Sequence, residues 1–191
     1  DDVMHLNELG FDQISVEPVV TDPELPYALT ESDLPAIAEE YEKLSKILIE
    51  RKKNGTSFNF FHFMIDLDQG PCAIKRLRGC SCGNEYVAVT PEGDIYPCHQ
   101  FVGEEKFKLG DIWNGVSNHA IQEDFASCNC YARPECRDGC ARLYCSGGCA
   151  ANAYHATGSV RGVYQQGCDL FRKRIECAVM VAVARELGAA E

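Results

Sequence analysis

The chain has 191 residues and a formal net charge of −11, and 46% of its residues are hydrophobic. This length is enough for one or two domains with a buried core. The acidic excess disfavours a nucleic-acid partner, because such binding depends on Lys and Arg that neutralise phosphates. The apolar runs are too short to cross a bilayer, and the first residues do not have the pattern of a secretory signal. We therefore expect no membrane partner and a cytoplasmic location.

The first 70 residues predict a strand, a helix and a second strand. Residues 11–20 contain a short apolar alternation that ends at a proline, which is typical of a strand of about six residues. A helix is expected from Ser32, with Pro35 in its first turn and Gly55 after its basic last turn. Its apolar face comprises Leu34, Ile37, Ala38, Tyr41, Leu44, Leu48 and Ile49. With a buried strand over residues 58–65, this order predicts a βαβ unit with parallel strands, which needs further strands to complete its sheet.

After residue 70 the chain becomes rich in cysteine and turn residues. Residues 85–97, EYVAVTPEGDIYP, predict a β-hairpin with Gly93 in the left-handed position of its turn. Residues 103–116 predict a loop that contains DIWNG. A closing helix is expected over residues 169–187. Its predicted buried face comprises Phe171, Ile175, Ala178, Val179 and Ala182.

All twelve cysteines lie between Cys72 and Cys177. An even number permits disulfides, which small secreted domains use when their cores are too small. Here the first 70 residues have the pattern of an ordinary cytosolic α/β segment, and nothing marks the chain for export. A reducing compartment makes metal or cluster ligation the better interpretation of the cysteines.

The segment CRDGCARLYCSGGC, residues 136–149, has the spacing C-x3-C-x4-C-x3-C. Gly139, Gly147 and Gly148 would let the backbone approach an inorganic core and direct N–H groups at its sulfurs. No C-x2-C pair occurs anywhere in the chain, which disfavours a zinc ribbon and a thioredoxin-type redox pair. The bacterial two-cluster ferredoxin run is missing too. Spacing alone therefore favours iron–sulfur clusters, with zinc, disulfides and unligated thiols as alternatives.

The segment CGNEYVAVTPEGDIYPCHQF, followed by the cysteine-rich stretch and by YQQGCDLFRKRIECA, resembles the SPASM domain of radical S-adenosylmethionine peptide maturases. The SPASM pattern is matched by Gly93-x4-Cys98, by Cys145-x3-Cys149 and by the distal Cys168. The most similar subgroup forms sulfur-to-carbon thioether cross-links in Cys-rich ribosomal peptides, the six-cysteine (SCIFF or ranthipeptide) precursors. GPCAIKRLRGC, FNFFHFMIDLD and LNELGFDQISVEPVV also resemble that subgroup.

The resemblance implies an α/β fold class. Residues 1–70 would be the last strands and helices of a partial TIM-like (β/α)6 barrel, and residues 71–191 a Cys-rich α+β SPASM domain with a β-hairpin. Two departures stand out. The family's C-x2-C-x5-C becomes C-x3-C-x4-C, with Gly139 in place of a cysteine and Cys140 beside it. The C-x3-C-x2-C motif that binds the S-adenosylmethionine cluster is absent from this chain. The chain is therefore expected to be the C-terminal half of a longer enzyme and to be inactive alone.

The resemblance also implies two auxiliary [4Fe–4S] clusters with cysteine-bound iron. The first would be bound by Cys80, Cys98 and Cys149. Its expected fourth ligand is Cys72, with Cys82 or an open site for a substrate thiolate as alternatives. The ligands of the second would be Cys136, Cys140, Cys145 and Cys168. Three further cysteines have no ligand role in the family: Cys177 is expected to be a small buried residue, and Cys128 and Cys130 to be spare thiols or alternatives to Cys140.

In the intact enzyme, a third [4Fe–4S] cluster would reduce S-adenosylmethionine, and the resulting radical would take a hydrogen from a peptide residue. A cysteine of the same peptide would then close the thioether, and an auxiliary cluster would accept the surplus electron. The implied partners are a Cys-rich precursor peptide, the remainder of the enzyme and an electron donor. The alternatives are a structural zinc-binding or peptide-docking module and an electron-transfer iron–sulfur protein.

No catalytic residue is assigned from the sequence. Strand alternation would place Phe60, His62, Met64 and Asp66 on one face, which a partial barrel could direct at its substrate. A packed strand with one hydrogen-bonded histidine is the favoured interpretation. Glu17 could face the active site or be solvated. His99 is expected to support Cys98 rather than to bind metal.

Overall fold

The computed structural model describes residues 1–21, 24–67 and 72–188. The chain divides into two compact units, one formed by residues 1–70 with residues 166–191 and the other by residues 71–165. The first division falls at the predicted boundary, whereas the last helix, expected in the cysteine-rich domain, belongs to the first unit. Gly70 and Pro71 of the GPC motif lie outside the described residues.

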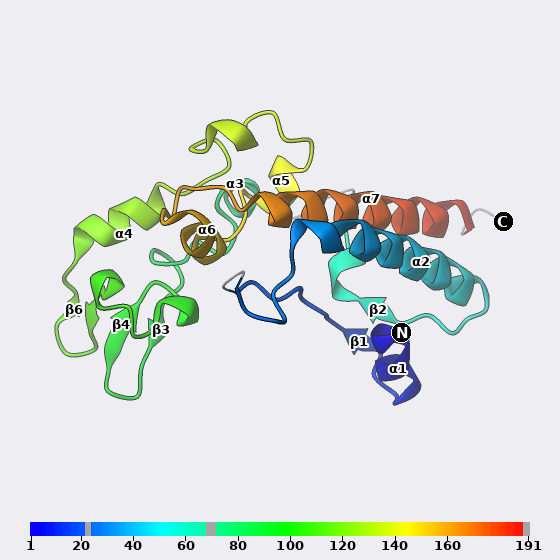
Figure 1. Ribbon diagram of the computed structural model, residues 1–191, viewed down its shortest axis with the longest axis horizontal. Coiled ribbons are helices and arrows are strands. Elements are labelled where there is room, and N and C mark those ends of the chain that lie inside the picture. Colours follow the sequence, from blue (N-terminus) through cyan, green and yellow to red (C-terminus); the bar gives the residue numbers. More distant parts are fainter. Residues whose placement is uncertain (22–23, 68–71, 189–191) are drawn as a thin grey trace. The chain divides into compact units, whose positions relative to one another are not determined.

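The first unit contains two long helices and a short parallel pair of strands (Figure 1). Its elements are α1 (Asp2–Glu8), β1 (Gln13–Ile14), a 3-10 helix (Glu31–Asp33), α2 (Leu34–Lys53), β2 (Asn59–Phe60), a second 3-10 helix (Phe61–Phe63) and α7 (Gln165–Gly188). β1 and β2 pair in parallel, with Gln13 opposite Asn59 and Ile14 opposite Phe60. The predicted strand–helix–strand order with parallel pairing is confirmed, although both strands are much shorter than predicted.

Local signals define both ends of α2. The Thr30 N–H donates to Asp33 Oδ2 at 2.8 Å, and the hydrogen bonds from Thr30 lower the pKa of Asp33. Such a capping interaction satisfies backbone groups that a helix start leaves free. At the other end, Gly55 has φ +70°, and the Thr56 N–H donates to the Arg51 carbonyl at 2.9 Å. This left-handed glycine ends the helix as predicted.

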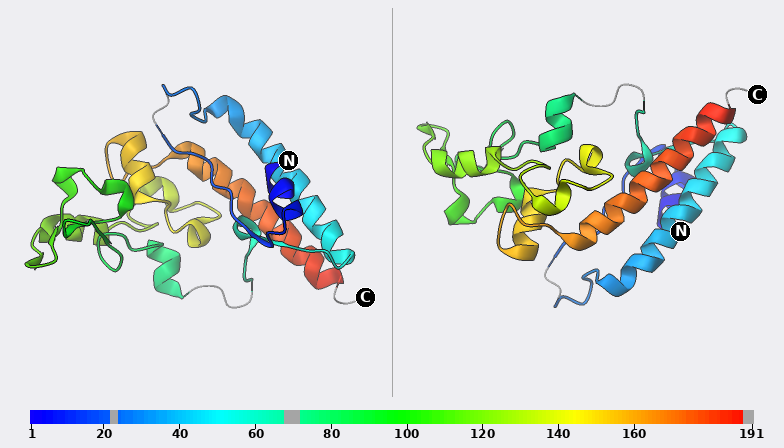
Figure 2. Two further views of the ribbon diagram at one scale, coloured as in Figure 1. Left: turned by 90° about the horizontal axis from the view of Figure 1, so that it is seen from below. Right: turned by 90° about the horizontal axis from the view of Figure 1, so that it is seen from above.

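The core of the first unit lies between α2 and α7, which run side by side in Figures 1 and 2. On α7 the predicted buried face is correct for Ala178 and wrong for Val179, which is 36% exposed. Phe171, Ile175 and Ala182 are half-buried, whereas Cys177 and Val181 are almost fully buried. The prediction that Cys177 is a buried apolar residue is confirmed. The fully buried residues of this core are Ile14, Tyr41, Leu44, Leu48, Phe58, Phe60, Phe63, Leu170, Cys177, Ala178 and Val181.

The predicted strand over residues 58–65 is wrong beyond Phe60, where the chain turns into a 3-10 helix. Phe60 and Phe63 are both buried and pack edge to face, with ring centroids 5.0 Å apart. A continuous strand would place these two rings on opposite faces, because side chains alternate along a strand. The turn therefore lets both rings enter one core, and it leaves Met64 exposed.

The second unit is built from short elements (Figure 1). They are α3 (Ala73–Arg78), β3 (Ala88–Val89), β4 (Asp94–Tyr96), 3-10 helices (His99–Phe101 and Glu105–Phe107), β5 (Gly110–Asp111), β6 (Gly115–Val116), α4 (His119–Ala126), a 3-10 helix (Pro134–Cys136), α5 (Arg142–Cys145) and α6 (Ala150–Thr157). The strands form an antiparallel sheet in the order β3-β4-β5-β6. β3 and β4 lie where the sequence predicts a hairpin, and β5 and β6 form a second hairpin in the segment predicted to be a loop.

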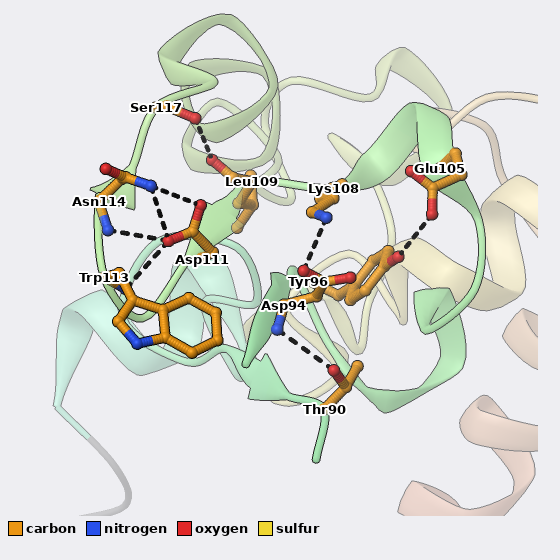
Figure 3. A network of polar contacts seen from close by, with 10 residues as sticks. All are labelled: Thr90, Asp94, Tyr96, Glu105, Lys108, Leu109, Asp111, Trp113, Asn114 and Ser117. Atoms are coloured by element: carbon orange, nitrogen blue, oxygen red, sulfur yellow. Dashed lines mark hydrogen bonds and ion pairs between the residues drawn. The ribbon is translucent and has the colours of Figure 1, made fainter. Parts of the chain in front are cut away.

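Side-chain polar contacts hold this sheet together (Figure 3). In the DIWNG turn, Asp111 Oδ1 accepts hydrogen bonds from the backbone N–H groups of Trp113 and Asn114 at 3.0 and 2.9 Å. Together with the Asn114 side chain, which contributes most, these bonds lower the pKa of Asp111. Lys108 pairs with Asp94 of β4 at 2.7 Å. This turn chemistry favours a tight connection between β5 and β6.

The apolar core of the second unit includes sulfur atoms. Its buried residues are Cys82, Cys98, Phe101, Phe125, Ala150, Ala151 and Val160. Phe101 is fully buried and packs edge to face on Phe125, with centroids 5.3 Å apart. In the described part of the chain, no helix has the length and apolar character needed to cross a membrane.

Candidate functional site

Four thiols from three separate segments meet in the second unit, and we call Cys80, Cys82, Cys98 and Cys149 the first thiol group. The thiol of Cys82 donates a hydrogen bond to the Cys80 sulfur. The pKa of Cys82 is raised by that bond first, then by burial and by the negative charges of the other three thiolates. Burial raises the pKa of Cys98, and the charges of Cys149 and Cys80 add to this effect. These thiols therefore lie close enough to repel one another when ionised.

Cys80 is the member of this group that ionises most easily. The hydrogen bond from Cys82, supported by the backbone N–H groups of Cys80 and Cys82, lowers the pKa of Cys80 to about 6. A thiolate, and not a thiol, is the form that binds metal. The site thus holds one ready thiolate at neutral pH, and further ionisation requires a positive charge to offset the repulsion.

The backbone around Cys80 and Cys82 explains how they reach Cys98. Gly79 and Ser81 have φ of +63° and +52°, so the chain turns sharply as α3 ends. The Gly83 N–H then donates to the Pro97 carbonyl at 3.0 Å, which joins this turn to the residue that precedes Cys98. A Cβ on Gly83 would lie 2.8 Å from the Phe125 side chain, so only glycine fits there.

Cys149 is positioned by α6, because it is the N-cap residue of this helix. Its sulfur also accepts a hydrogen bond from Gln100 Nε2 at 3.8 Å. The N-cap position and the Gln100 contact thus fix where the Cys149 sulfur lies. Gln100, two residues after Cys98, is a contact that the sequence analysis missed. The expected role of His99 beside Cys98 stays a prediction.

A second set of thiols lies in the loops around α5, and we call Cys130, Cys136 and Cys145 the second thiol group. Cys130 is fully buried and Cys136 is 8% exposed. Burial raises the pKa of both thiols, and the charge of Cys145 raises both pKa values further. Positive charges act in the opposite direction: Arg142 lowers the pKa of Cys130, and Arg133 lowers that of Cys136.

Arg133 is a buried cation beside the second thiol group, with an exposed fraction of only 2%. Its guanidinium donates to the Gly147 carbonyl, and to the Val160 carbonyl at 2.7 Å. Its Nε is buried without a hydrogen-bond partner in the structure. A buried charge is costly unless it is paired, so an anionic group held by the thiols would complement it. The sequence analysis did not identify Arg133, because nothing in RPEC distinguishes a buried arginine from an exposed one.

The SGG segment between Cys145 and Cys149 has an unusual backbone. Ser146, Gly147 and Gly148 all have positive φ, of +55°, +83° and +81°. A Cβ on Gly147 would lie 2.8 Å from Arg133 Nη1 and 3.1 Å from the Cys130 Cα. Gly147 is therefore needed both for its conformation and for the close approach of the Cys130 backbone.

The predicted ligands fall into three categories in the structure. Cys80, Cys98 and Cys149 are brought together, with Cys82 as a fourth thiol, and Cys136 lies near Cys145. Cys72 and Cys140 are exposed, one at the N-cap of α3 and the other in the turn before α5. Cys168 lies on α7 in the first unit. Ligation by each of these cysteines stays a prediction.

An open cavity lies within the second unit beside two members of the first thiol group. Its lining includes Cys80, Cys82 and Cys128, two arginines, Arg78 and Arg133, and apolar and small residues. Within the described residues, no three His, Cys, Asp or Glu side chains converge closely enough to hold a single metal ion. The donor atoms of both thiol groups are sulfur throughout, which is the chemistry of iron–sulfur ligation, so the residues present fit such a cofactor.

In the first unit, polar side chains gather where β1 and β2 end. His62 Nε2 lies 3.3 Å from Glu17 Oε1 and 3.3 Å from Ser15 Oγ. Arg174 of α7 bonds to Glu17 and to the Tyr41 hydroxyl, each at 3.0 Å. The His62 side chain is only 4% exposed. Burial and then the charge of Arg174 lower its pKa, although Glu17 acts against them. The structure thus joins Glu17 and His62, which the sequence analysis considered separately, at the carboxyl edge of parallel strands.

Comparison with known proteins gives a likeness of structure only. No family model matches the sequence, and no curated protein matches it. Among solved structures, anSMEcpe with bound AdoMet and the Kp18Cys peptide has a TM-score of 0.65 at 18% identity, over 96% of this chain and 53% of that chain. The complex of anSMEcpe with AdoMet and the Cp18Cys peptide gives the same TM-score and identity, over 97% and 53% of the two chains. Hexahistidine-tagged anSMEcpe with AdoMet has a TM-score of 0.66 at 18% identity, over 96% and 50%.

This chain shares the fold of anSMEcpe. The likeness is one of fold, at 18% identity. The chain spans about half the length of the solved chains that it matches. The comparison does not extend to the thioether-forming subgroup.

Proposed function

We propose that this chain is the C-terminal part of a radical S-adenosylmethionine enzyme that installs sulfur-to-carbon thioether cross-links in a Cys-rich ribosomal peptide. The observation that carries the proposal is the convergence of Cys80, Cys82, Cys98 and Cys149 in a fold shared with a radical SAM peptide maturase. The motifs GDIYPCHQF and CSGGC, which resemble the thioether-forming subgroup, contribute two of these thiols. The bound peptides in the anSMEcpe complexes support a peptide as the partner of this chain as well.

The first thiol group would hold one [4Fe–4S] cluster. We assign its fourth ligand to Cys82 rather than to the predicted Cys72, because Cys82 is hydrogen bonded to Cys80 and interacts with Cys98 and Cys149. Four protein thiolates complete the coordination of such a cluster. The alternative of an open site for a substrate thiolate is then disfavoured, and the substrate cysteine must be held by other groups.

The second thiol group would hold a further cluster, with Cys136 and Cys145 among its ligands. When bound, such a cofactor would supply a one-electron acceptor. The residues of the chain have distinct tasks around it. Arg133 and Arg142 offset the negative charge of the thiolates, and the glycines of the SGG segment let the backbone approach closely.

Thioether formation is an oxidation, so it needs an electron acceptor. One C–H bond and one S–H bond of the peptide break and one C–S bond forms. One hydrogen atom leaves to the 5′-deoxyadenosyl radical, one proton leaves to solvent or a base, and one electron must be removed. Sulfur-ligated sites in the second unit suit the last task. S-adenosylmethionine and its own cluster would be bound by the remainder of the enzyme, in the cytoplasm.

The first experiment measures iron, acid-labile sulfide and zinc per chain after anaerobic reconstitution. We expect about eight irons and eight sulfides, which corresponds to two [4Fe–4S] clusters. Cys82→Ala should lose iron, and Cys72→Ala, its exposed counterpart, should not. Zinc without sulfide would contradict the proposal and leave a structural or peptide-docking module.

The second experiment tests the reaction with the longer enzyme that contains this chain. With S-adenosylmethionine, a reductant and a Cys-rich precursor peptide, each cross-link should remove a pair of hydrogen atoms and one alkylatable thiol from the peptide. Tandem mass spectrometry locates the new C–S bond. Full cluster content with electron transfer to a separate acceptor, but with no change in the peptide, would instead indicate an electron-transfer protein.

A further inference from the structure

The second thiol group contains a cysteine that the SPASM pattern does not use. The pattern assigns a ligand near residue 139, where this chain has glycine, and the neighbouring Cys140 is the obvious substitute. The structure places Cys140 on the surface, in the turn formed as the Gly139 N–H donates to the Cys136 carbonyl. Cys130, six positions before Cys136, is by contrast fully buried.

Several contacts fix Cys130 beside the CSGGC loop. Its backbone N–H donates to the Leu77 carbonyl at 3.1 Å, which ties it to α3. Its Cα and N would each lie 3.1 Å from a Cβ on Gly147, so the two backbones are in contact. Arg133, three residues later, reaches the Gly147 carbonyl from the same side. Ser146 completes the arrangement by donating to the Lys75 carbonyl of α3 at 2.9 Å.

We infer that Cys130 replaces Cys140 as a ligand of the second iron–sulfur cluster, in the set Cys130, Cys136 and Cys145. This inference rests on the proposed function. The local spacing becomes C-x5-C-x8-C. Cys130 is fully buried beside Cys136 and Cys145, and Arg133 and Arg142 carry the positive charge that a thiolate-bound cluster requires.

The sulfur of Cys128, in contrast, already has backbone partners. It donates to the carbonyls of Asp124 and Val160, at 3.5 and 3.6 Å. Cys128 packs against the apolar core of the second unit. The two cysteines of the CNC segment thus have different environments, and Cys128 provides a matched control for Cys130.

The test uses anaerobically reconstituted chain with three single substitutions. Cys130→Ala should lose about half of the iron and sulfide of the wild-type chain, because one cluster of two would be lost. Cys128→Ala and Cys140→Ala should retain the wild-type content. Iron lost from Cys140→Ala but retained in Cys130→Ala would overturn the inference. Absence of iron and sulfide from the wild-type chain would overturn the proposed function as well. Failure of the proposed function is thereby distinguished from failure of the Cys130 inference alone.

A second measurement needs no substitution and therefore no assumption about folding. Iodoacetamide is added to the reconstituted wild-type chain, and alkylated cysteines are located by peptide mapping while the iron content is followed. A free Cys140 should be alkylated without loss of iron, whereas Cys130 should be alkylated only after a chelator and denaturant remove the cluster. If Cys140 is protected until iron is removed, it is a ligand and the inference is wrong.

A third measurement uses the conservative variant Cys130→Ser. It should change the electron paramagnetic resonance signal of one reduced cluster and leave that of the other unchanged.

Discussion

The two units of this chain are stabilised in different ways. The first has two long helices whose apolar faces bury Leu44, Leu48 and Val181 against phenylalanine rings. The second has helices of at most eight residues in its described part, and three of its cysteines belong to or pack against its small core. The first unit therefore depends on the burial of apolar surface. For the second, we propose that a positively charged inorganic core offsets the repulsion among its ionised thiols.

The sharpest test of this difference is removal of the cofactor that we propose. Chelation of iron from the reconstituted chain should abolish the hydrogen-exchange protection of residues 72–165, because folding and metal binding are coupled where the core is small. Protection in α2 and α7 should persist. The measurement is hydrogen exchange followed by mass spectrometry. Equal loss of protection in both units would show that the first unit does not fold by apolar burial alone.

A core substitution in the first unit should destabilise that unit and leave the iron content of the second unit unchanged. Leu48 is 1% exposed, and Leu48→Ala should lower the free energy of unfolding by about 2–5 kcal/mol, because it leaves a cavity. Ile47, its neighbour on α2, is 36% exposed, and Ile47→Ala should change that free energy by about 0.5 kcal/mol or less. Denaturant unfolding of the first unit, followed by helix circular dichroism, measures both. Iron content should stay unchanged in each variant.

Alanine substitution at two adjacent glycines of the second unit distinguishes the cost of steric overlap from the cost of backbone strain. Gly147→Ala places a Cβ 2.8 Å from Arg133 at φ +83°, so strain and overpacking together should cost about 2–5 kcal/mol. Gly148 has nearly the same φ, +81°, but a Cβ there would meet nothing within 4 Å. Gly148→Ala should therefore cost only about 1 kcal/mol. The readouts are iron content and unfolding free energy, and equal effects would exclude close packing at Gly147.

The smallest expected effect concerns His62 in the first unit. Burial and Arg174 hold its pKa below the usual histidine value, so His62 stays neutral in the folded chain at neutral pH. The unfolded chain then binds a proton more readily, so the contribution of His62 to stability is complete above a pH of about 6.5 and is lost as pH falls from there through the lower pKa of the folded chain. Proton NMR titration should show that Arg174→Gln raises the pKa of His62 and Glu17→Gln lowers it further. Identical titration curves in all three proteins would show that neither charge acts on the ring.

Local structure followed from local sequence where the interacting residues are neighbours. The C-terminal end of α2 was predictable because Gly55 acts within one turn of the helix, and its start at Leu34 lies two residues after the predicted Ser32. The burial of Cys177 was predictable because a cysteine without a ligand role behaves as a small apolar residue. The extent of β2 was not, because its end depends on Phe60 and Phe63 entering a core whose other members lie on α2 and α7.

The sequence by itself determined the type of chemistry: cysteines restricted to residues 72–177, glycine-rich spacers and motifs that resemble a SPASM domain. Tertiary structure decided which thiols meet. Cys82 joins Cys98 because Gly83 bonds to Pro97, and Cys130 joins Cys145 because its backbone packs on Gly147 and bonds to Leu77. These contacts join segments that are far apart in the chain, and spacing within one segment carries no information about them. The physical reason is that a thiolate site is selected by burial and by compensating charge, which arise only when the segments pack together.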